Sequence, residues 1–124
     1  MLPLESLMIS RCVVDAAISF FALVDDDAVT LRIECPFVLT DDDGSHAVDP
    51  SVPRTLGPAV ALFGATVARA SASETGRLEL VFEDGRTVLV EPSDEFEAWE
   101  LSGPGDAKAV CRMDGGVSTW GAKS

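Results

Sequence analysis

Histidine, cysteine and tyrosine are scarce in this chain, and their scarcity limits the catalytic sites that it can build. The 124 residues include no tyrosine, one histidine (His46) and three cysteines. A serine or cysteine nucleophile normally needs a base within hydrogen-bond reach, and no spacing pairs His46 with Cys12, Cys35 or Cys111. The sequence therefore favours a protein that is not an enzyme, and it predicts no catalytic residues.

Motifs for metals and nucleotides are also missing. His46 and the three cysteines lack the closely spaced ligand pairs that are typical of structural zinc sites. The run Asp41-Asp42-Asp43 suggests a calcium loop, but the twelfth position counted from Asp41 is Val52 and not the glutamate of an EF-hand. Neither a dinucleotide-binding glycine motif nor a P-loop occurs. We expect no cofactor and no metal site.

Basic residues and long apolar runs are few. The chain has 9 basic and 21 acidic residues, which give a net charge of −12. This charge disfavours binding to nucleic acid, because the protein would repel the phosphates. The apolar run 59–68 is shorter than the roughly 20 residues that span a membrane. The N-terminus lacks the features of a secretory signal, and an odd number of cysteines fits a reducing compartment. We expect a cytoplasmic protein whose acidic surface attracts a basic protein or simply maintains solubility.

Apolar periodicity predicts one α+β domain over residues 1–124 that is mostly β. A hydrophobic content of 47% is sufficient for a core. Around residues 55–64 the period changes to that of a short helix, with Leu56, Ala59, Val60 and Phe63 on its apolar face, Thr55 as N-cap and Gly64 at its end. Segments 40–46 and 49–53 are expected to be loops. Strands are predicted at 9–15, 18–24, 28–35, 78–82, 87–90, 107–113 and 117–120.

The clearest hairpin lies between Leu78–Phe82 and Thr87–Val90, with Asp84-Gly85 at its tip. A two-residue loop would set Val81 opposite Val88 and Leu80 opposite Leu89. Both sheet faces would then be partly apolar, with Leu78, Leu80, Phe82 and Leu89 on one and the valines Val81, Val88 and Val90 on the other. We expect the valine face to be covered by the helix, by a second sheet or by another chain.

A faint internal repeat relates the two halves of the chain. Residues 84–91 align with 27–34 through matching Asp, Thr and Glu positions and equivalent apolar positions. The alignment extends to a pseudo-repeat of about 9–37 and 67–101, joined by the helix. Two explanations remain open, namely duplication and chance similarity between amphipathic hairpins. The expected architecture is two related antiparallel meanders that form a sandwich or a partly open barrel, with one short helix between the halves.

The segment 96–101, with the sequence FEAWEL, places two aromatic rings among carboxylates. In one interpretation Phe96 and Trp99 close one end of the core, after a single helical turn capped by Asp94. In the other, Trp99 is the anchor of a protein interface with an acidic rim. The candidate partner-binding residues in that case are Asp94, Glu95, Phe96, Glu97, Trp99 and Glu100.

FEAWEL, the pair Val110-Cys111, the glycines Gly115-Gly116 and the terminal Trp120 together resemble a family of small bacterial proteins of unknown function, largely from actinobacteria. The resemblance extends from about Ile9 to Trp120 and includes the Pro36-Phe37 step that ends the first half. Residues 112–114 depart from it, because a proline is more usual there. The resemblance implies two β-rich halves and a bacterial cytoplasmic origin. It implies no activity and no catalytic residues.

Three functions follow from these observations. The first is a non-enzymatic, acidic protein-binding domain, for example an immunity-type inhibitor of a basic toxin or effector, because electrostatic complementarity accelerates capture of such a partner. The second is a small-ligand-binding or enzymatic β-barrel with its mouth near Trp99. The third is a self-associating structural domain, in which the valine face closes a homodimer.

Overall fold

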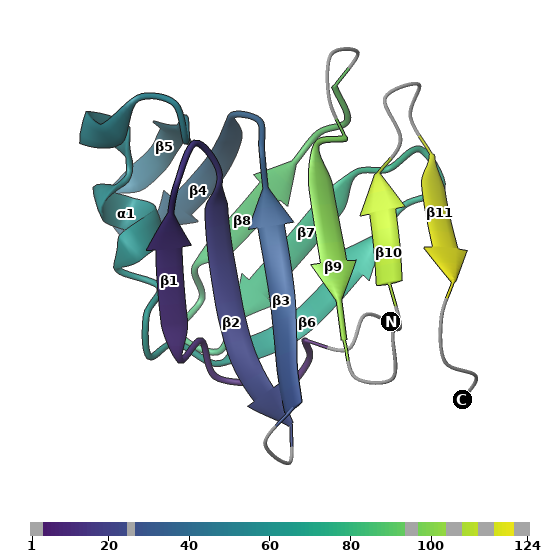
Figure 1. Cartoon of the computed structure of the whole chain (residues 1–124). Helices are drawn as coiled ribbons and strands as arrows, with labels where there is room; N and C mark the ends of the chain where they lie inside the picture. Colours follow the sequence, from purple (N-terminus) through teal and green to yellow (C-terminus); the bar gives the residue numbers. More distant parts are fainter. Residues whose placement is uncertain (1–3, 25–26, 94–96, 104–107, 112–115, 121–124) are drawn as a thin grey trace.

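Eleven strands and one short helix make up the described part of the chain (Figure 1). The computed structural model describes residues 4–24, 27–93, 97–103, 108–111 and 116–120. The strands are β1 (Arg11–Val14), β2 (Ile18–Val24), β3 (Asp27–Ile33), β4 (Phe37–Asp41), β5 (Gly44–Val48), β6 (Val67–Ala72), β7 (Leu78–Phe82), β8 (Thr87–Val90), β9 (Trp99–Ser102), β10 (Lys108–Cys111) and β11 (Val117–Trp120). Most of the predicted strands are therefore confirmed, and the fold is mostly β.

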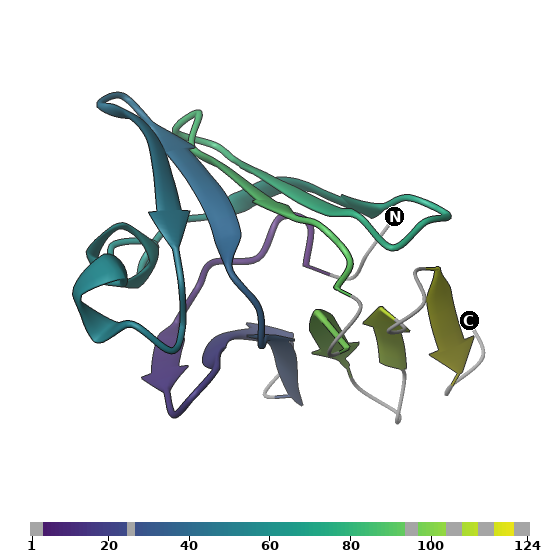
Figure 2. The ribbon, with the colours of Figure 1, turned by 90° about the horizontal axis from the view of Figure 1, so that it is seen from above.

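The strands form two antiparallel sheets that face each other, as Figure 2 shows from above. One sheet has six strands in the order β1-β2-β3-β9-β10-β11, and the other has five in the order β5-β4-β8-β7-β6. The sheets are separate, so of the two predicted architectures the sandwich is the correct one. The core lies between the two sheets, and both sheets contribute residues to it. Trp99 is fully buried there. The other core residues include Phe20, Leu31, Ile33, Leu39, Leu80, Phe82, Val88 and Leu101.

Each half of the chain contributes to both sheets. Strands β1-β2-β3 lie in the six-stranded sheet and β4-β5 in the other, whereas β6-β7-β8 lie in the five-stranded sheet and β9-β10-β11 cross back. The halves consequently meet twice, where β3 pairs with β9 and where β4 pairs with β8. The predicted duplication of the two halves stays a prediction.

The β7–β8 hairpin has the predicted strands but not the predicted register. Val81 lies opposite Thr87, and Leu80 lies opposite Val88. The shift arises because the loop is longer than two residues: the Gly85 N–H donates to the Phe82 carbonyl, and the Phe82 N–H donates to the Arg86 carbonyl. Gly85 adopts a left-handed φ of 95°, as expected for a type I turn followed by a glycine bulge.

The register decides which side chains are buried. Because side chains alternate along a strand, a shift of one residue exchanges the two faces of β8. Val88 and Val90 point into the core with Leu78, Leu80 and Phe82, and Leu89 is half-buried on the outer face with Val81. The predicted grouping of Val81 with Val88 and Val90 is therefore wrong.

The helix is shorter than predicted. A 3-10 helix η1 (Pro53–Thr55) precedes α1 (Gly57–Val60), and both flank the sandwich beside β5 (Figures 1 and 2). The predicted N-cap at Thr55 is wrong, since its hydroxyl bonds to the backbone of Asp49 and Val52, and Leu56 is the N-cap. The buried residues of this segment are Leu56, Ala59 and Leu62, whereas Val60 and Phe63 are exposed.

Strand β5 was not predicted, because residues 40–46 contain the polar and flexible sequence of a turn. The turn is limited to the link between β4 and β5, where Asp41 pairs with Gly44. Strand β5 then pairs with β4 in spite of its low intrinsic strand preference. The prediction of a loop over the whole of 40–46 is thus wrong at both ends.

Candidate functional site

FEAWEL begins strand β9, and its tryptophan belongs to the core. Trp99 has a relative exposure of 0%, and its indole Nε1–H donates a 2.8 Å hydrogen bond to the Gly76 carbonyl in the β6–β7 turn. This bond joins the two sheets at the side away from α1. A side chain without exposed surface cannot contact a partner directly, so Trp99 fits the core interpretation. Phe96, Asp94 and Glu95 lie outside the described residues.

The other described residues of the predicted surface do not converge with Trp99. Glu97 is exposed before β9. Glu100 is half-buried and lies opposite Arg32 across the β3–β9 pair. Because Trp99 and Glu100 alternate along one strand, they point to opposite faces of the six-stranded sheet. A binding role for Glu97 and Glu100 stays a prediction, and Trp99 would serve it only by fixing β9.

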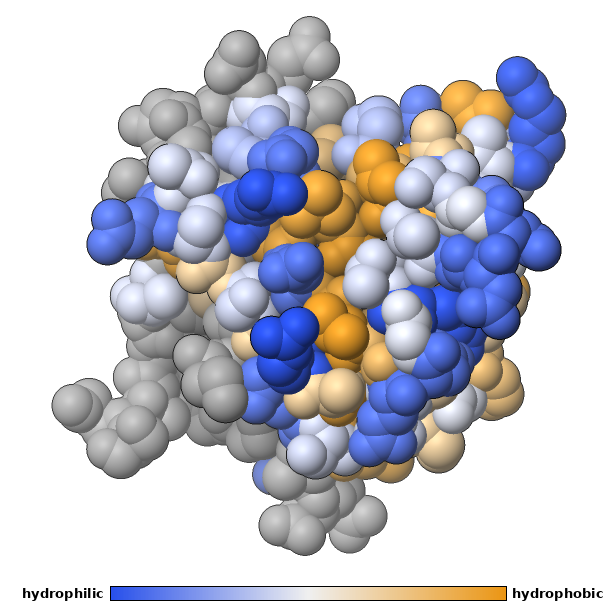
Figure 3. All heavy atoms as spheres, turned by 180° about the vertical axis from the view of Figure 1, so that it is seen from behind, coloured by the Kyte–Doolittle hydropathy of each residue, from blue (hydrophilic) through white to orange (hydrophobic). Residues whose placement is uncertain are grey.

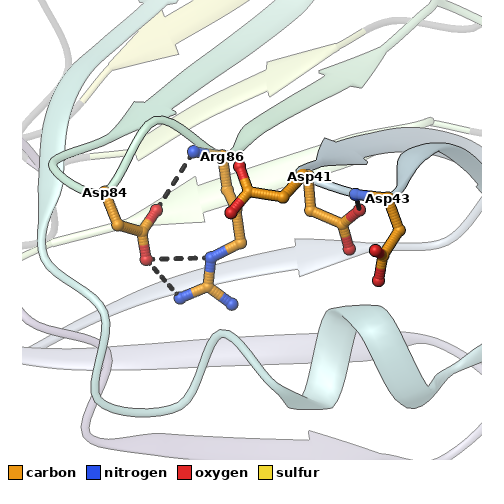
Figure 4. Close-up of a pocket in the computed structure, with 5 residues that line it drawn as sticks. Asp41, Asp43, Asp84 and Arg86 are labelled. Atoms are coloured by element: carbon orange, nitrogen blue, oxygen red, sulfur yellow. Dashed lines mark hydrogen bonds and ion pairs between the residues drawn. The ribbon is translucent and has the colours of Figure 1, made fainter.

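A second acidic group lies at the opposite side of the sandwich, next to α1. Asp41, Asp42 and Asp43 from the β4–β5 turn and Asp84 and Arg86 from the β7–β8 turn line a hollow of about 270 Å³ (Figure 4). We call these five residues the acidic hollow. The turns meet because β4 and β8 are antiparallel neighbours, with Thr40 opposite Thr87.

Hydrogen bonds fix some of these carboxylates and leave others available. Asp84 Oδ2 accepts hydrogen bonds from two guanidinium nitrogens of Arg86, at 2.9 Å from Nε and 2.6 Å from Nη2. Asp41 accepts bonds of 2.9 Å from His46 Nε2 and from the Asp43 N–H. The carboxylates of Asp42 and Asp43 form no ion pair with any described residue. They are the available negative charges of the acidic hollow.

The same contacts lower two pKa values. Arg86 holds the pKa of Asp84 below its usual 3.8, through side-chain and then backbone hydrogen bonds. The hydrogen bond from His46 is the main cause that lowers the pKa of Asp41. Both carboxylates therefore remain ionised at any pH near neutrality, and the hollow keeps its negative charge.

An exposed apolar group adjoins the acidic hollow. The Phe63 side chain is 63% exposed, and Met8 and Val60 are also exposed. Two hydrogen bonds tie the segment of Val60 and Phe63 to the β7–β8 turn: the Arg86 side chain donates from Nη1 to the Ala61 carbonyl, and the Glu83 N–H donates to the Thr66 carbonyl. Met8 is bridged to Thr66, and the Gly64 N–H donates to the Ile9 carbonyl. We call Met8, Val60, Phe63 and the acidic hollow together the α1 end.

The sequence interpretation missed the α1 end for two reasons. The aspartates of 41–43 were interpreted as a solvated turn, and their proximity to Asp84 depends on the β4–β8 pairing between distant segments. Phe63 was assigned to the buried face of the helix, although Leu62 occupies that position.

Three further features of the described residues concern metal binding, the cysteine thiols and membrane-spanning helices. Among these residues no group of three or more His, Cys, Asp or Glu residues is arranged to hold a metal ion. Burial raises the pKa of the Cys12 thiol, and the Cys35 thiol contacts the carbonyls of Glu91 and Ala98. In the same part of the chain, no helix has the length and apolar content needed to cross a bilayer.

The Asp84–Arg86 pair predicts a pH dependence of stability. A carboxylate whose pKa is lower in the folded state stabilises the fold above its usual pKa of 3.8, and this contribution disappears as the pH falls through the folded value. Asp84→Asn keeps the hydrogen-bond acceptor but removes the charge. We expect wild type to be more stable by under about 1 kcal/mol at pH 7, since the pair is partly exposed. Thermal unfolding followed by circular dichroism should show this difference shrink as the pH falls below 3.8 and through the lower folded pKa. A difference that grows with acidification would contradict the assignment.

Comparison with known proteins places the chain in a family without assigning it an activity. No curated protein and no solved structure matches it. One family model matches residues 1–121, a range that includes every described strand. The match supports the resemblance to a family of unknown function, while the bacterial source stays an expectation. The chain belongs to the family of unknown function DUF6188.

Proposed function

We propose that this chain is a non-enzymatic protein-binding domain that captures a basic protein through the α1 end. The observation that carries this proposal is the exposure of Phe63 beside available carboxylates. A large aromatic side chain that inserts into a partner, surrounded by a polar rim, is the usual arrangement of an interface hot spot. The interface anchor that the sequence suggested at Trp99 is thus proposed at Phe63.

The charge of the domain supports a basic partner. A net charge of −12 steers a basic protein toward the surface over the Debye length, and the unpaired Asp42 and Asp43 then pair with its Lys or Arg side chains. One form of this function is an immunity-type inhibitor of a basic toxin or effector. We place it in the bacterial cytoplasm, where a thiol such as that of Cys12 would remain reduced.

The lining of the hollows favours this function over small-ligand binding. Pockets for small ligands are lined mainly by hydrophobic and aromatic side chains. The acidic hollow is lined by four aspartates and an arginine, and a second hollow of about 390 Å³ by Ser71, Ala72, Ser73, Arg77 and Glu79. Neither of these two includes Glu97 or Glu100, the carboxylates near Trp99 whose presence in a pocket would favour ligand binding.

Calorimetric titration against the purified products of the adjacent genes tests the proposal. We expect one of them to bind, and its Kd to rise at least about tenfold between ~50 and ~500 mM NaCl, because the attraction is screened. Phe63→Ala should weaken binding by about 30-fold, equivalent to ~2 kcal/mol. The double variant Asp42→Asn/Asp43→Asn should weaken it by about 3- to 10-fold, mainly through the association rate.

Two matched controls identify the surface. Leu23 is 57% exposed on the six-stranded sheet, and Leu23→Ala should leave the Kd unchanged. Asp27→Asn/Glu74→Gln removes the same two charges at exposed sites outside the hollow. Equal effects of the two double variants would show that net charge acts without a defined site. The proposal would be contradicted by a Kd that changes neither with salt nor with Phe63→Ala. It would also be contradicted if no product of an adjacent gene binds.

A further inference from the structure

The outer face of the five-stranded sheet carries an apolar strip that no element of the described chain covers. Val38 is 41% exposed, and it lies opposite Leu89, which is half-buried. Val81 lies opposite Thr87 on the same face. Figure 3, which views the molecule from behind, shows the apolar strip with hydrophilic residues on both sides. A sheet with apolar side chains on both faces is typical of one that is covered on both.

The charges on this face nearly cancel, unlike those of the whole chain. On this face Arg69 of β6 lies opposite Val81 of β7, and Ser71 of β6 lies opposite Glu79 of β7. Arg77 and Glu91 form an ion pair of 3.4 Å at the end of the face, and both are exposed. Glu83 is exposed and continues the alternation of Glu79 and Val81, so the face carries two positive and three negative groups, a net charge of −1 against −12 for the chain.

We propose that the occupant of this face is a second copy of this chain, packed sheet against sheet. Two copies with a charge of −12 each repel one another, and the repulsion is weakest where both present a nearly neutral surface. A strongly basic partner has no electrostatic reason to choose this face over the acidic hollow. The apolar strip runs from Val38 through Leu89 to Val81. Burial of this apolar surface in both copies provides the attraction.

The size of the face sets the expected affinity. Five strands spaced ~4.8 Å apart, over about five residues each, give roughly 400 Å² for each copy. Stable complexes bury about 800 Å² for each partner, so the dimer should be weak and reversible. We expect a dissociation constant of about 10 to 100 μM, as for small, transient interfaces.

Sedimentation velocity of the full chain, from about 5 μM to about 1 mM, tests this inference. Wild type should shift from monomer to dimer across this range. Added NaCl should tighten the dimer, because salt screens the repulsion between two acidic copies. Binding of a basic partner to the α1 end should weaken under the same salt, so the two proposals can fail independently of each other.

Substitutions locate the interface. Val38→Lys places charges near the centre of the face in both copies and should raise the dissociation constant by more than about tenfold. Leu89→Lys is a second variant on the same face, and its ammonium would lie opposite Glu79, which favours folding. Leu23→Lys, on the outer face of the six-stranded sheet, is the control and should dimerise like wild type. A protein that is monomeric at ~1 mM, or a dimer that Leu23→Lys disrupts and Val38→Lys leaves intact, would overturn the inference.

Discussion

Trp99→Ala should lower the free energy of unfolding by about 3–5 kcal/mol, the range for deleting a large buried aromatic side chain. Trp99 is fully buried between the sheets, so the substitution leaves a cavity that the two sheets cannot close without moving. It also removes the donor to the Gly76 carbonyl and so breaks a link between β9 and the β6–β7 turn. Guanidinium unfolding followed by circular dichroism measures the loss.

The same substitution separates the two interpretations of FEAWEL. Leu23→Ala is the control, since truncation of an exposed side chain should change stability by no more than about 0.5 kcal/mol. If Trp99→Ala costs less than ~1 kcal/mol and instead weakens partner binding, Trp99 is an interface anchor and its place in the core is wrong. Loss of stability with unchanged binding per folded molecule supports the structure.

Val88→Lys should destabilise the protein far more than Leu89→Lys, although the two positions are adjacent. Val88 is fully buried between Leu39 and Leu80, and an ammonium there would be desolvated without a partner. We expect a loss of more than about 4 kcal/mol, enough to unfold a domain of marginal stability. At Leu89 the ammonium would lie outside, opposite Glu79, and the loss should stay below about 1 kcal/mol.

This comparison tests the hairpin register directly. In the register of a two-residue loop, Leu89 would share the buried face with Leu80 and Phe82, and the order of the two variants would be reversed. Soluble yield and chemical unfolding of both variants provide the measurement. A more severe loss for Leu89→Lys would mean that the longer loop around Gly85 is incorrect.

Strand positions could be predicted from the sequence because they depend on local patterns. The alternation of β3 and the Asp84-Gly85 turn are signals within a few neighbouring residues, and both led to the correct elements. The register could not be predicted, because Asp-Gly is compatible with loops of two or three residues. Strand β5 depends on pairing with β4, since Gly44-Ser45-His46 has little strand preference of its own.

The candidate site could not be predicted, because it depends on which strands become neighbours. Asp42 and Asp84 are far apart in the sequence, and only the β4–β8 pairing brings their turns together. The exposure of Phe63 depends on where the helix ends, which is the least certain feature of such a prediction. The acidic character of the surface, by contrast, followed from composition alone.

Binding through the α1 end can be tested by a hydrogen-exchange footprint of the complex with the binding partner. Amide exchange is compared for the free chain and for the chain saturated with the adjacent-gene product that binds it. We expect slower amide exchange in the complex than in the free chain at residues 60–64, 41–44 and 83–86. Protection confined to residues 97–103, with no change at these three segments, would contradict it and would return the binding surface to FEAWEL.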